Sequence, residues 1–148
     1  MVLIAFKFVL LNFSFGISQK CCLMQVRLMT IQRKLLGRKG EETAARYLEK
    51  SGYRVLSRNY SCRLGEIDIV ALERDVLVFV EVRSRSGDNY GLAQESVTGR
   101  KQFKLRQLAW QYLKAEGKTG SDCRFDVIAI LFDGEGEVKR LDHIENAF

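Results

Sequence analysis

The feature that most constrains the fold is a pair of neighbouring segments, Gly65–Leu72 and Val76–Arg85, in which charged and aliphatic residues alternate. Alternation with a period of two is typical of β-strands, because successive side chains then lie on opposite faces. Only a few residues separate the segments, so we expect an antiparallel hairpin with Arg74 and Asp75 in the turn. The sequence therefore predicts a hairpin in which one face is aliphatic and the other carries charged residues at one end.

A turn at these two residues fixes the register of the hairpin. On the first face the expected pairs are Leu72 with Leu77, Val70 with Phe79, Asp68 with Glu81, and Glu66 with Arg83. On the second face they are Ile67 with Val82, Ile69 with Val80, and Ala71 with Val78. A shift by one residue would set acids against valines, so this register is favoured. Because Arg-Asp is not a preferred turn pair, a longer loop would shift the pairing slightly.

Asp68 and Glu81 are the chemically informative pair of this hairpin. Directly opposed residues have Cβ atoms ~5 Å apart, and two carboxylates that close repel unless one is protonated or a cation lies between them. Oxygen ligands without His or Cys select Mg²⁺ or Mn²⁺ over zinc. Arg83 points to the same side and would offer positive charge to a phosphate. The pattern predicts a divalent-metal site of nuclease type.

A surface ladder of salt bridges is the alternative interpretation. In it Glu66 pairs with Arg83 across the hairpin, and Asp68 and Glu81 are simply solvated. The same face continues as apolar residues, however, so its charged end borders a core. Charges beside a core need partners or a metal ion.

The rest of the chain predicts two helices and three further strands. Apolar spacing indicates a helix over residues 31–51, which Gly52 would end, and a second helix over residues 93–116. The expected strands are 53–60, 124–132, a nearly continuous apolar run typical of a strand buried on both faces, and 137–141. The order α-β-β-β-α-β-β predicts an α/β domain with a mixed sheet and helices packed against it.

The first thirty residues differ from the rest, being apolar, rich in aromatic residues and free of acids. Three interpretations stay open: translation that begins at Met29 or Met24, an export signal with its hydrophobic stretch at 8–17, and a genuine hydrophobic extension. Lys7 comes late for a signal peptide, and no A-x-A-like cleavage site follows. A membrane-spanning helix needs about 20 apolar residues, more than this interrupted run offers. We therefore expect a leader at 1–30 and one domain at 31–148.

The net charge of +6 is mildly basic and unevenly distributed. Basic residues dominate between Arg33 and Arg63, and acids dominate from Glu116 onward. Such asymmetry suits a protein with one face toward a polyanion, although charges on solvated helices would look the same. The four cysteines form no CxxC or Cys/His spacing, so the sequence predicts no zinc site and favours a reducing cytoplasmic location.

Two motifs and their flanks carry a family resemblance. The segments GEID (65–68) and FVEVR (79–83) resemble the PD-(D/E)xK nuclease signature. Together with GRKGEETAARYLEKSGY (37–53) and the block from Val97-Thr98 to Lys101, they make the chain similar to the YraN family of bacterial proteins, which is related to archaeal Holliday-junction resolvases. The resemblance covers residues 36–141.

The resemblance implies a restriction-endonuclease-like core and metal ligands at Asp68 and Glu81, with Glu41 completing the acidic site. Glu41 would equally suit the first turns of a helix. Arg83 stands where the family usually has Lys, and an arginine does not readily act as a base. Phosphate binding is therefore a firmer expectation for Arg83 than catalysis.

The second helix would begin with Arg100, Lys101 and Lys104, and Lys101 matches a recurring basic position of the family. We expect these residues to contact the phosphates of nucleic acid, although a solvated helix face would look similar. Phe103 and Trp110 are expected in the core or in an interface.

The implied function is a Mg²⁺- or Mn²⁺-dependent endonuclease that hydrolyses DNA, with branched or structured DNA as a substrate. The alternative is a non-catalytic nucleic-acid-binding protein on the same fold. We expect no small-molecule cofactor, a homodimer of the kind common among resolvases, and no membrane association unless the leader is real.

Overall fold

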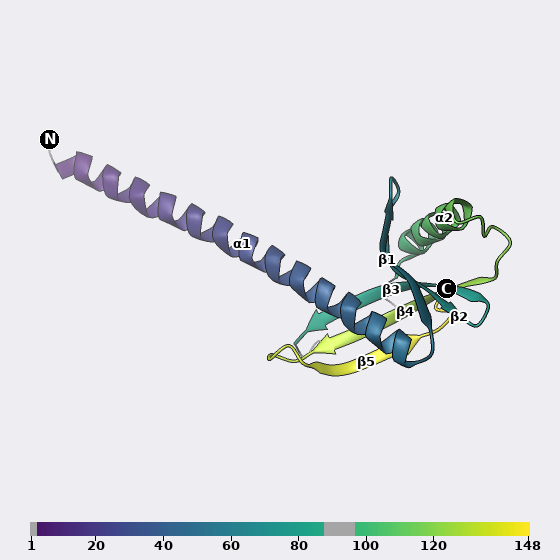
Figure 1. Ribbon diagram of the computed structural model, residues 1–148. Helices are drawn as coiled ribbons and strands as arrows, with labels where there is room; N and C mark the ends of the chain where they lie inside the picture. The colour runs from purple at the N-terminus through teal and green to yellow at the C-terminus, as the bar shows by residue number, and fades with distance from the viewer. Residues whose placement is uncertain (1–2, 88–96) are drawn as a thin grey trace. The chain divides into compact units, whose positions relative to one another are not determined.

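A computed structural model describes the backbone of residues 3–87 and 97–148, and side chains from residue 24 within those ranges. The chain divides into two compact units, Met1–Leu35 and Leu36–Phe148. The elements are α1 (Leu3–Lys50), β1 (Arg54–Cys62), β2 (Gly65–Glu73), β3 (Val76–Ser86), α2 (Gly99–Ala115), β4 (Cys123–Phe132) and β5 (Val138–Ile144) (Figure 1). The predicted α/β class and element order are confirmed.

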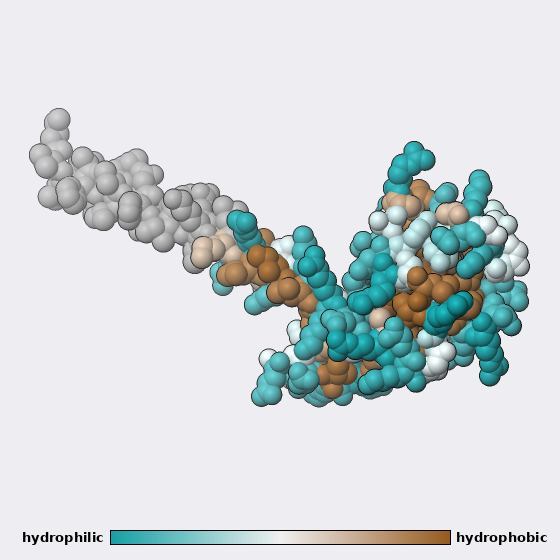
Figure 2. Space-filling model, in the orientation of Figure 1, coloured by the Kyte–Doolittle hydropathy of each residue, from teal (hydrophilic) through white to brown (hydrophobic). Residues whose placement is uncertain are grey.

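The first unit consists of the earlier part of α1. The helix begins at Leu3 rather than near residue 31, so the helical prediction started too late. Its described side chains are exposed, among them the hydrophobic Met24, Leu28 and Leu35. Figure 2 shows hydrophobic and hydrophilic residues side by side on this stretch. Within the ranges that the structure describes, no helix has both the length and the hydropathy needed to cross a bilayer. The assignment of residues 1–30 as a leader stays a prediction.

The second unit is built on a five-stranded sheet in the order β1-β2-β3-β4-β5. All neighbouring strands pair antiparallel except β3 and β4, which are parallel. A parallel pair needs a long crossover connection, and α2 lies in that connection. The sheet is therefore mixed, as the sequence predicts.

Each face of this sheet carries one apolar layer. The last turns of α1 bury Ala44, Ala45 and Leu48 against one face, in a cluster with Ile69, Ala71, Val78, Val80, Ile128 and Ile130. α2 buries Leu105, Leu108, Ala109 and Tyr112 against the other face, with Val70, Leu77, Phe79 and Val127. β3 and β4 are thus covered on both faces, which explains the nearly continuous apolar run of β4.

Gly40 allows α1 to approach β3 closely. A Cβ atom at this residue would overlap the hydroxyl of Ser84 and would lie 2.9 Å from the Ser84 Cβ. Real Cβ atoms do not come this close to other carbon atoms, so only glycine fits here without a shift of the backbone. The next residue, Glu41, is held near β3 by this contact.

The predicted hairpin register is confirmed for four of its seven pairs, Leu72–Leu77, Ala71–Val78, Val70–Phe79 and Ile69–Val80. Arg74 has a positive φ of 53°, as a tight turn requires, and Glu73 pairs with Val76 across it. Pairing of β2 with β3 then continues as far as Ile69 with Val80.

Beyond that pair the prediction is wrong. Asp68–Glu81, Ile67–Val82 and Glu66–Arg83 are absent from the ladder, because β2 leaves β3 there and continues along β1, with Glu66 opposite Ser61. Ile67 joins the α2 layer and not the layer of Ile69, so the aliphatic face does not run straight through.

Two further predictions along α2 are corrected. The helix begins at Gly99 with Thr98 as its N-cap, later than predicted, and residues 93–96 lie outside the described part of the chain. Phe103 and Trp110 are 64% and 53% exposed, so neither lies in the core; an interface role stays a prediction. They occupy the outer side of α2, whereas Leu105 and Leu108 face the sheet.

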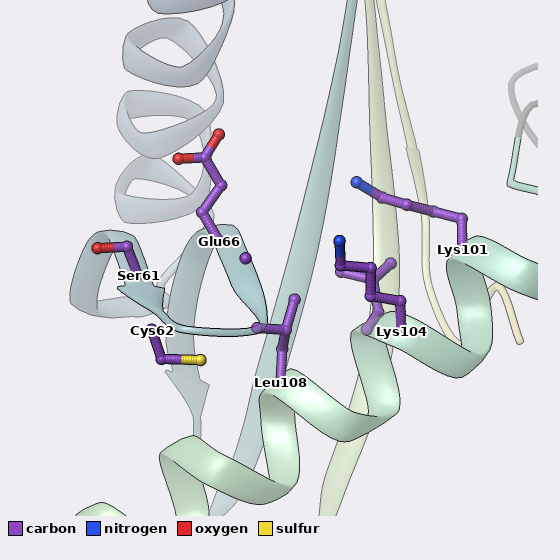
Figure 3. A pocket seen from close by; sticks show the side chains of 8 residues that line it. Ser61, Cys62, Glu66, Lys101, Lys104 and Leu108 are labelled. Atoms are coloured by element: carbon purple, nitrogen blue, oxygen red, sulfur yellow. The ribbon is translucent and has the colours of Figure 1, made fainter.

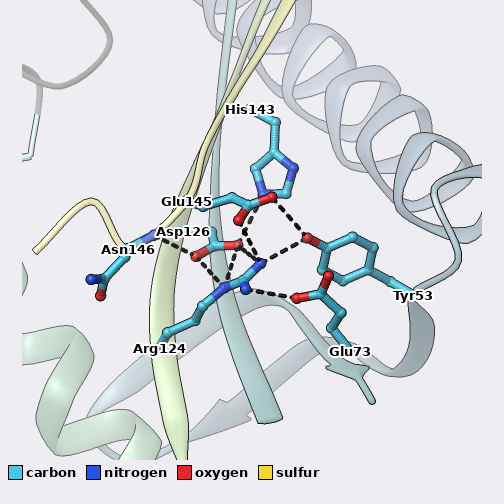
Figure 4. A network of polar contacts seen from close by, with 7 residues as sticks. All are labelled: Tyr53, Glu73, Arg124, Asp126, His143, Glu145 and Asn146. Atoms are coloured by element: carbon cyan, nitrogen blue, oxygen red, sulfur yellow. Dashed lines mark hydrogen bonds and ion pairs between the residues drawn. The ribbon is translucent and has the colours of Figure 1, made fainter.

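One fully buried carboxylate ties the start of β4 to its neighbours. Asp126 is 0% exposed and accepts hydrogen bonds from the Arg124 guanidinium, from the His143 ring at 2.9 Å and from the Asn146 backbone N–H at 2.9 Å (Figure 4). Arg124 reaches on to Glu73 of β2 at 2.6 Å and to the Tyr53 hydroxyl at 2.7 Å. The network therefore joins β4, β5, the end of β2 and the residue before β1.

Electrostatics show that this buried charge is satisfied. Burial alone would raise the pKa of Asp126, but the bonds from His143, Arg124 and Asn146 outweigh it, and the pKa is lowered from 3.8. A lowered pKa in the folded state means that the ionised form stabilises the fold.

The close approach at Gly40 gives a first prediction. Gly40→Ala should lower the free energy of unfolding by roughly 1–3 kcal/mol, because the added methyl group overpacks the α1–β3 contact. Gly37→Ala is the matched control: its added Cβ meets nothing within 4 Å, so the better helix former should leave the protein equally or more stable. Urea denaturation of both variants measures the difference, and equal stabilities would contradict the contact.

The Asp126 network gives a second prediction. Asp126→Asn should lower the free energy of unfolding at pH 7 by about 3–5 kcal/mol, because it breaks the buried ion pair between Asp126 and Arg124. The stabilisation is present above the ordinary pKa of 3.8 and is lost as the pH falls through the lowered folded value, so the two proteins should converge in acid. Asp75→Asn, in the exposed turn, should change stability by at most about 0.5 kcal/mol. A constant difference down to the acid limit would argue against this origin.

Candidate functional site

The acidic residues singled out by the sequence lie where β2 and β3 separate. After the Ile69–Val80 pair, the Val82 N–H has no ladder partner on β2 and donates instead to the Asp68 carboxylate at 2.7 Å. β3 continues alongside β4, where Glu81 pairs with Val127. Asp68 and Glu81 thus come from two strands whose backbone pairing has just ended.

Glu81 is buried, with 5% of its surface exposed, and its two carboxylate oxygens have different surroundings. Oε1 contacts Arg83 Nη2 at 3.3 Å and Lys101 Nζ at 3.2 Å. Arg83 reaches it because residues two apart on a strand share a face. Oε2 is buried and has no hydrogen-bond partner among the described residues. A buried carboxylate oxygen without a partner is costly and rare in folded proteins.

Asp68 is destabilised as an anion. Burial and, next, the negative charge of Glu81 raise its pKa from 3.8 to about 7. The Val82 N–H bond and the Lys101 ammonium act the other way, while Glu41 adds to the increase. The same interactions show that Glu41, Asp68, Glu81 and Lys101 lie within electrostatic range of one another. The structure therefore brings the three predicted acids together.

Glu41 joins this group from α1. It is partly buried and follows Gly40, whose contact with Ser84 holds the helix close to β3. Its neighbour Glu42 is exposed and pairs with Arg46 one turn along the helix. The two adjacent glutamates thus differ in role: Glu42 forms an ordinary helix-surface pair, and Glu41 adds negative charge to the site.

The donors present fit a hard divalent cation held by a pair of carboxylates. The partnerless Glu81 Oε2 and the repelled Asp68 carboxylate both gain from a positive ion between them. Among the residues that the structure describes, no three Asp, Glu, His or Cys side chains already form a metal-binding group. Two carboxylates are enough for Mg²⁺, which usually keeps several waters. The metal roles of Asp68, Glu81 and Glu41 remain predictions.

The three basic residues predicted on α2 lie in different places. Lys101 points into the acidic site and contacts Glu81, a closer association than the sequence indicated. Lys104 lines a pocket next to that site, together with Glu66 of β2 (Figure 3). Arg100 is exposed at the start of the helix. The Thr98 hydroxyl accepts from the Lys101 N–H at 3.4 Å and caps the helix just ahead of the site.

Sequence reasoning missed the residues of the β1–β2 turn that line this pocket. Ser61, Cys62 and Gly65 lie on it. Ser61 and Cys62 belong to no motif with recognisable chemistry, and Gly65 begins the GEID motif, in which only the acids indicated a role. Gly65 has a φ of 138°, a conformation that favours glycine, and an added Cβ would come within 3.2 Å of Lys104. A glycine at the start of a strand was the one available sequence signal, and it says nothing about a cavity.

Comparison with known proteins gives the same family for a family model and for individual relatives. Residues 40–130 match the model of "Uncharacterised protein family UPF0102". A UPF0102 protein of Pelotomaculum thermopropionicum is 72% identical over 120 residues, covering 81% of this chain and 100% of the relative. UPF0102 proteins of Desulforamulus reducens and Moorella thermoacetica are 51% and 50% identical over 121 and 120 residues, covering 80% and 81% of this chain and 99% and 100% of the relatives. The matched range contains every acidic and basic residue of the site.

The destabilised carboxylate of Asp68 gives a third prediction, which applies to the metal-free protein. Asp68→Asn should raise the free energy of unfolding at pH 8 in a chelator, on the order of 1–3 kcal/mol, because it removes an anion that burial and, next, the charge of Glu81 destabilise. Asn can still accept the Val82 N–H bond. Since the folded pKa is raised, the carboxylate opposes folding only above its unfolded value, and the advantage of Asn should grow from about pH 4 to pH 8.

Glu66→Gln serves as the control for this measurement, because Glu66 is an exposed acid on the same strand. It should change stability by at most about 0.5 kcal/mol across the same pH range. An Asp68→Asn protein that is less stable than wild type at pH 8 would contradict the repulsion.

Proposed function

We propose a nuclease function for this chain, which belongs to the UPF0102 family, the YraN family of the sequence resemblance. The proposed activity is hydrolysis of DNA phosphodiester bonds in the presence of Mg²⁺ or Mn²⁺. The observation that carries the proposal is the buried, partnerless oxygen of Glu81 beside the destabilised carboxylate of Asp68. A fold retains such a cost where the groups serve a ligand.

In this proposal Asp68 and Glu81 hold the cation, and Glu41 adds negative charge from α1. When bound, a divalent ion supplies Lewis-acid polarisation of the phosphate and lowers the pKa of water. The bond from the Val82 N–H fixes the Asp68 carboxylate. The buried position of Glu81 excludes bulk water from one side of the site and strengthens electrostatic interactions there.

Arg83 and Lys101 have different tasks. Arg83 keeps its charge and has a planar set of donors, which suits binding of the scissile phosphate. Lys101 brings an ammonium group to the same carboxylate, 3.2 Å from Glu81 Oε1, although residue 83 is not a lysine. We assign to Lys101 the donation of a proton to the departing oxygen as the P–O bond breaks. The attacking water forms the new P–O bond and releases its proton to solvent, from which Lys101 is protonated again. Lys104 and Arg100 contact neighbouring phosphates.

A second candidate function is binding of nucleic acid without cleavage. The observation that favours it is the ion pair of Arg83 with Glu81, because an arginine at this position cannot easily accept a proton. Such a protein would bind DNA through the same basic residues, and its affinity would fall steeply with salt.

Cleavage assays on the full chain give the fourth prediction. With linear and branched DNA and Mg²⁺ or Mn²⁺, wild type should cut, and Asp68→Asn and Glu81→Gln should each lose about a hundredfold or more in rate, as removal of transition-state stabilisation does. Glu41→Gln should lower the rate, whereas Glu42→Gln, the matched neighbour outside the site, should not. Lys101→Met should reduce the cleavage rate more than DNA affinity.

The outcomes separate the two candidates. Cleavage that is equal in wild type, Asp68→Asn and Glu81→Gln would come from a contaminant and would refute the proposed site. Salt-dependent binding without cleavage by wild type, in either metal, would support the second candidate.

A further inference from the structure

We propose that the pocket between α2 and the β1–β2 turn binds one unpaired guanine nucleotide of the DNA substrate. The pocket has a volume of about 490 Å³ and is lined by Ser61, Cys62, Gly65, Glu66, Lys101, Lys104, Leu105 and Leu108. This volume lies within the usual range for ligand sites, roughly 300–1,000 Å³. The position of the pocket beside the scissile bond rests on the nuclease function proposed above; its ligand does not.

Opposite charges stand on the two walls of this pocket. Figure 3 shows Lys101 and Lys104 extending from α2 toward the side that carries Glu66, on β2. Among the described residues, Glu66 and Lys104 have no ion pair or side-chain hydrogen bond, with each other or with any third residue. Two unlike charges that line one pocket without pairing match a ligand that is anionic at one end and a hydrogen-bond donor at the other.

A nucleotide has this distribution of groups. Its phosphate is the anion that lysines bind, and its base carries N–H donors. Part of the pocket lining is apolar and comes from Leu105 and Leu108, which are 2% and 1% exposed. Apolar side chains of this kind suit the flat face of a base, while the polar groups fix its orientation.

Glu66 favours guanine among the four bases. A carboxylate only accepts hydrogen bonds, and it can accept two in parallel. The Watson–Crick edge of guanine presents two adjacent donors, N1–H and the N2 amino group, whereas adenine, cytosine and thymine each present only one donor group there. Those edges are free only in an unpaired base, so the ligand is a nucleotide outside a duplex.

Lys101 connects this pocket to the acidic site. Its ammonium group contacts Glu81 Oε1 at 3.2 Å, and the same side chain lines the pocket. A nucleotide held there would place its phosphate next to Lys101 and hence beside the proposed cation site. The structure thus favours DNA with an unpaired guanine next to the cleaved bond, as in a flap, a bulge or a branch.

Cys62 allows a direct test that needs neither metal nor cleavage. It lines the pocket, while Cys123 is a free, exposed cysteine outside it and serves as an internal reference. The full chain is alkylated with N-ethylmaleimide in a chelator, and the rate at each cysteine is read by mass spectrometry. The probes are dGMP, dAMP, dCMP, dTMP, deoxyguanosine and inorganic phosphate. The pentanucleotides TTGTT and TTTTT distinguish a guanine within a strand from a free nucleotide.

We expect dGMP and TTGTT to slow alkylation of Cys62 and to leave alkylation of Cys123 unchanged. The other nucleotides and TTTTT should need about tenfold higher concentrations for the same effect. Glu66→Gln should remove the preference for guanine. Lys104→Met should weaken the protection of Cys62 by every nucleotide and leave its protection by deoxyguanosine unchanged, because deoxyguanosine has no phosphate. Protection by dGMP but not by TTGTT would show that the pocket binds a free nucleotide, and would contradict a guanine within a DNA strand as the ligand.

Other results would overturn the guanine pocket itself. These are no protection of Cys62 by any nucleotide, equal protection by inorganic phosphate, or a base preference that Glu66→Gln leaves intact. Because no cleavage is measured, these results are independent of the nuclease assay: an inactive protein can still show guanine-specific protection, and an active one can lack it.

Discussion

The arrangement of the site depends on one hydrogen bond, from the Val82 N–H to the Asp68 carboxylate. A regular hairpin would have given this N–H a backbone acceptor on β2, and the two strands would have stayed paired. Here a side chain takes that place, β2 leaves β3, and the β1–β2 turn is free to lie against α2. The acidic site lies where the two strands separate, and the neighbouring pocket lies between the β1–β2 turn and α2.

Two carboxylates of the sheet, the buried Asp126 and the half-buried Asp68, have opposite effects on stability. Asp126, on the α1 side, accepts bonds from three residues, and its pKa is lowered. Asp68 receives one backbone bond beside a second carboxylate, and its pKa is raised to about 7. The first arrangement stabilises the domain, and the second destabilises it in the absence of a ligand. Since net stabilities are only about 5–15 kcal/mol, the well-satisfied Asp126 network helps the fold to tolerate the site.

Sequence alone predicted what depends on local periodicity and failed where distant elements meet. The turn at Arg74 and the pairs back to Ile69 and Val80 follow from alternation and a short loop. The break at Asp68 does not, because it depends on a side chain replacing a backbone acceptor. The sequence likewise placed Lys101 among the basic residues expected to contact phosphates. Its contact with Glu81 could not be predicted, because it requires the packing of α2 on the sheet. Phe103 and Trp110 were misplaced because aromatic character does not tell which side of a helix faces inward.

One stripe of α2 links the acidic site to the pocket. Lys101, Lys104, Leu105 and Leu108 recur at helical spacing and therefore share a face. The stripe begins with the ammonium group on Glu81 and ends with buried leucines that anchor the helix to the core. Because a helix moves as a rigid body over so short a length, a ligand that shifts α2 at the pocket must also shift Lys101 relative to Glu81. In the proposed nuclease, occupation of the pocket and the position of the proton donor are therefore mechanically coupled.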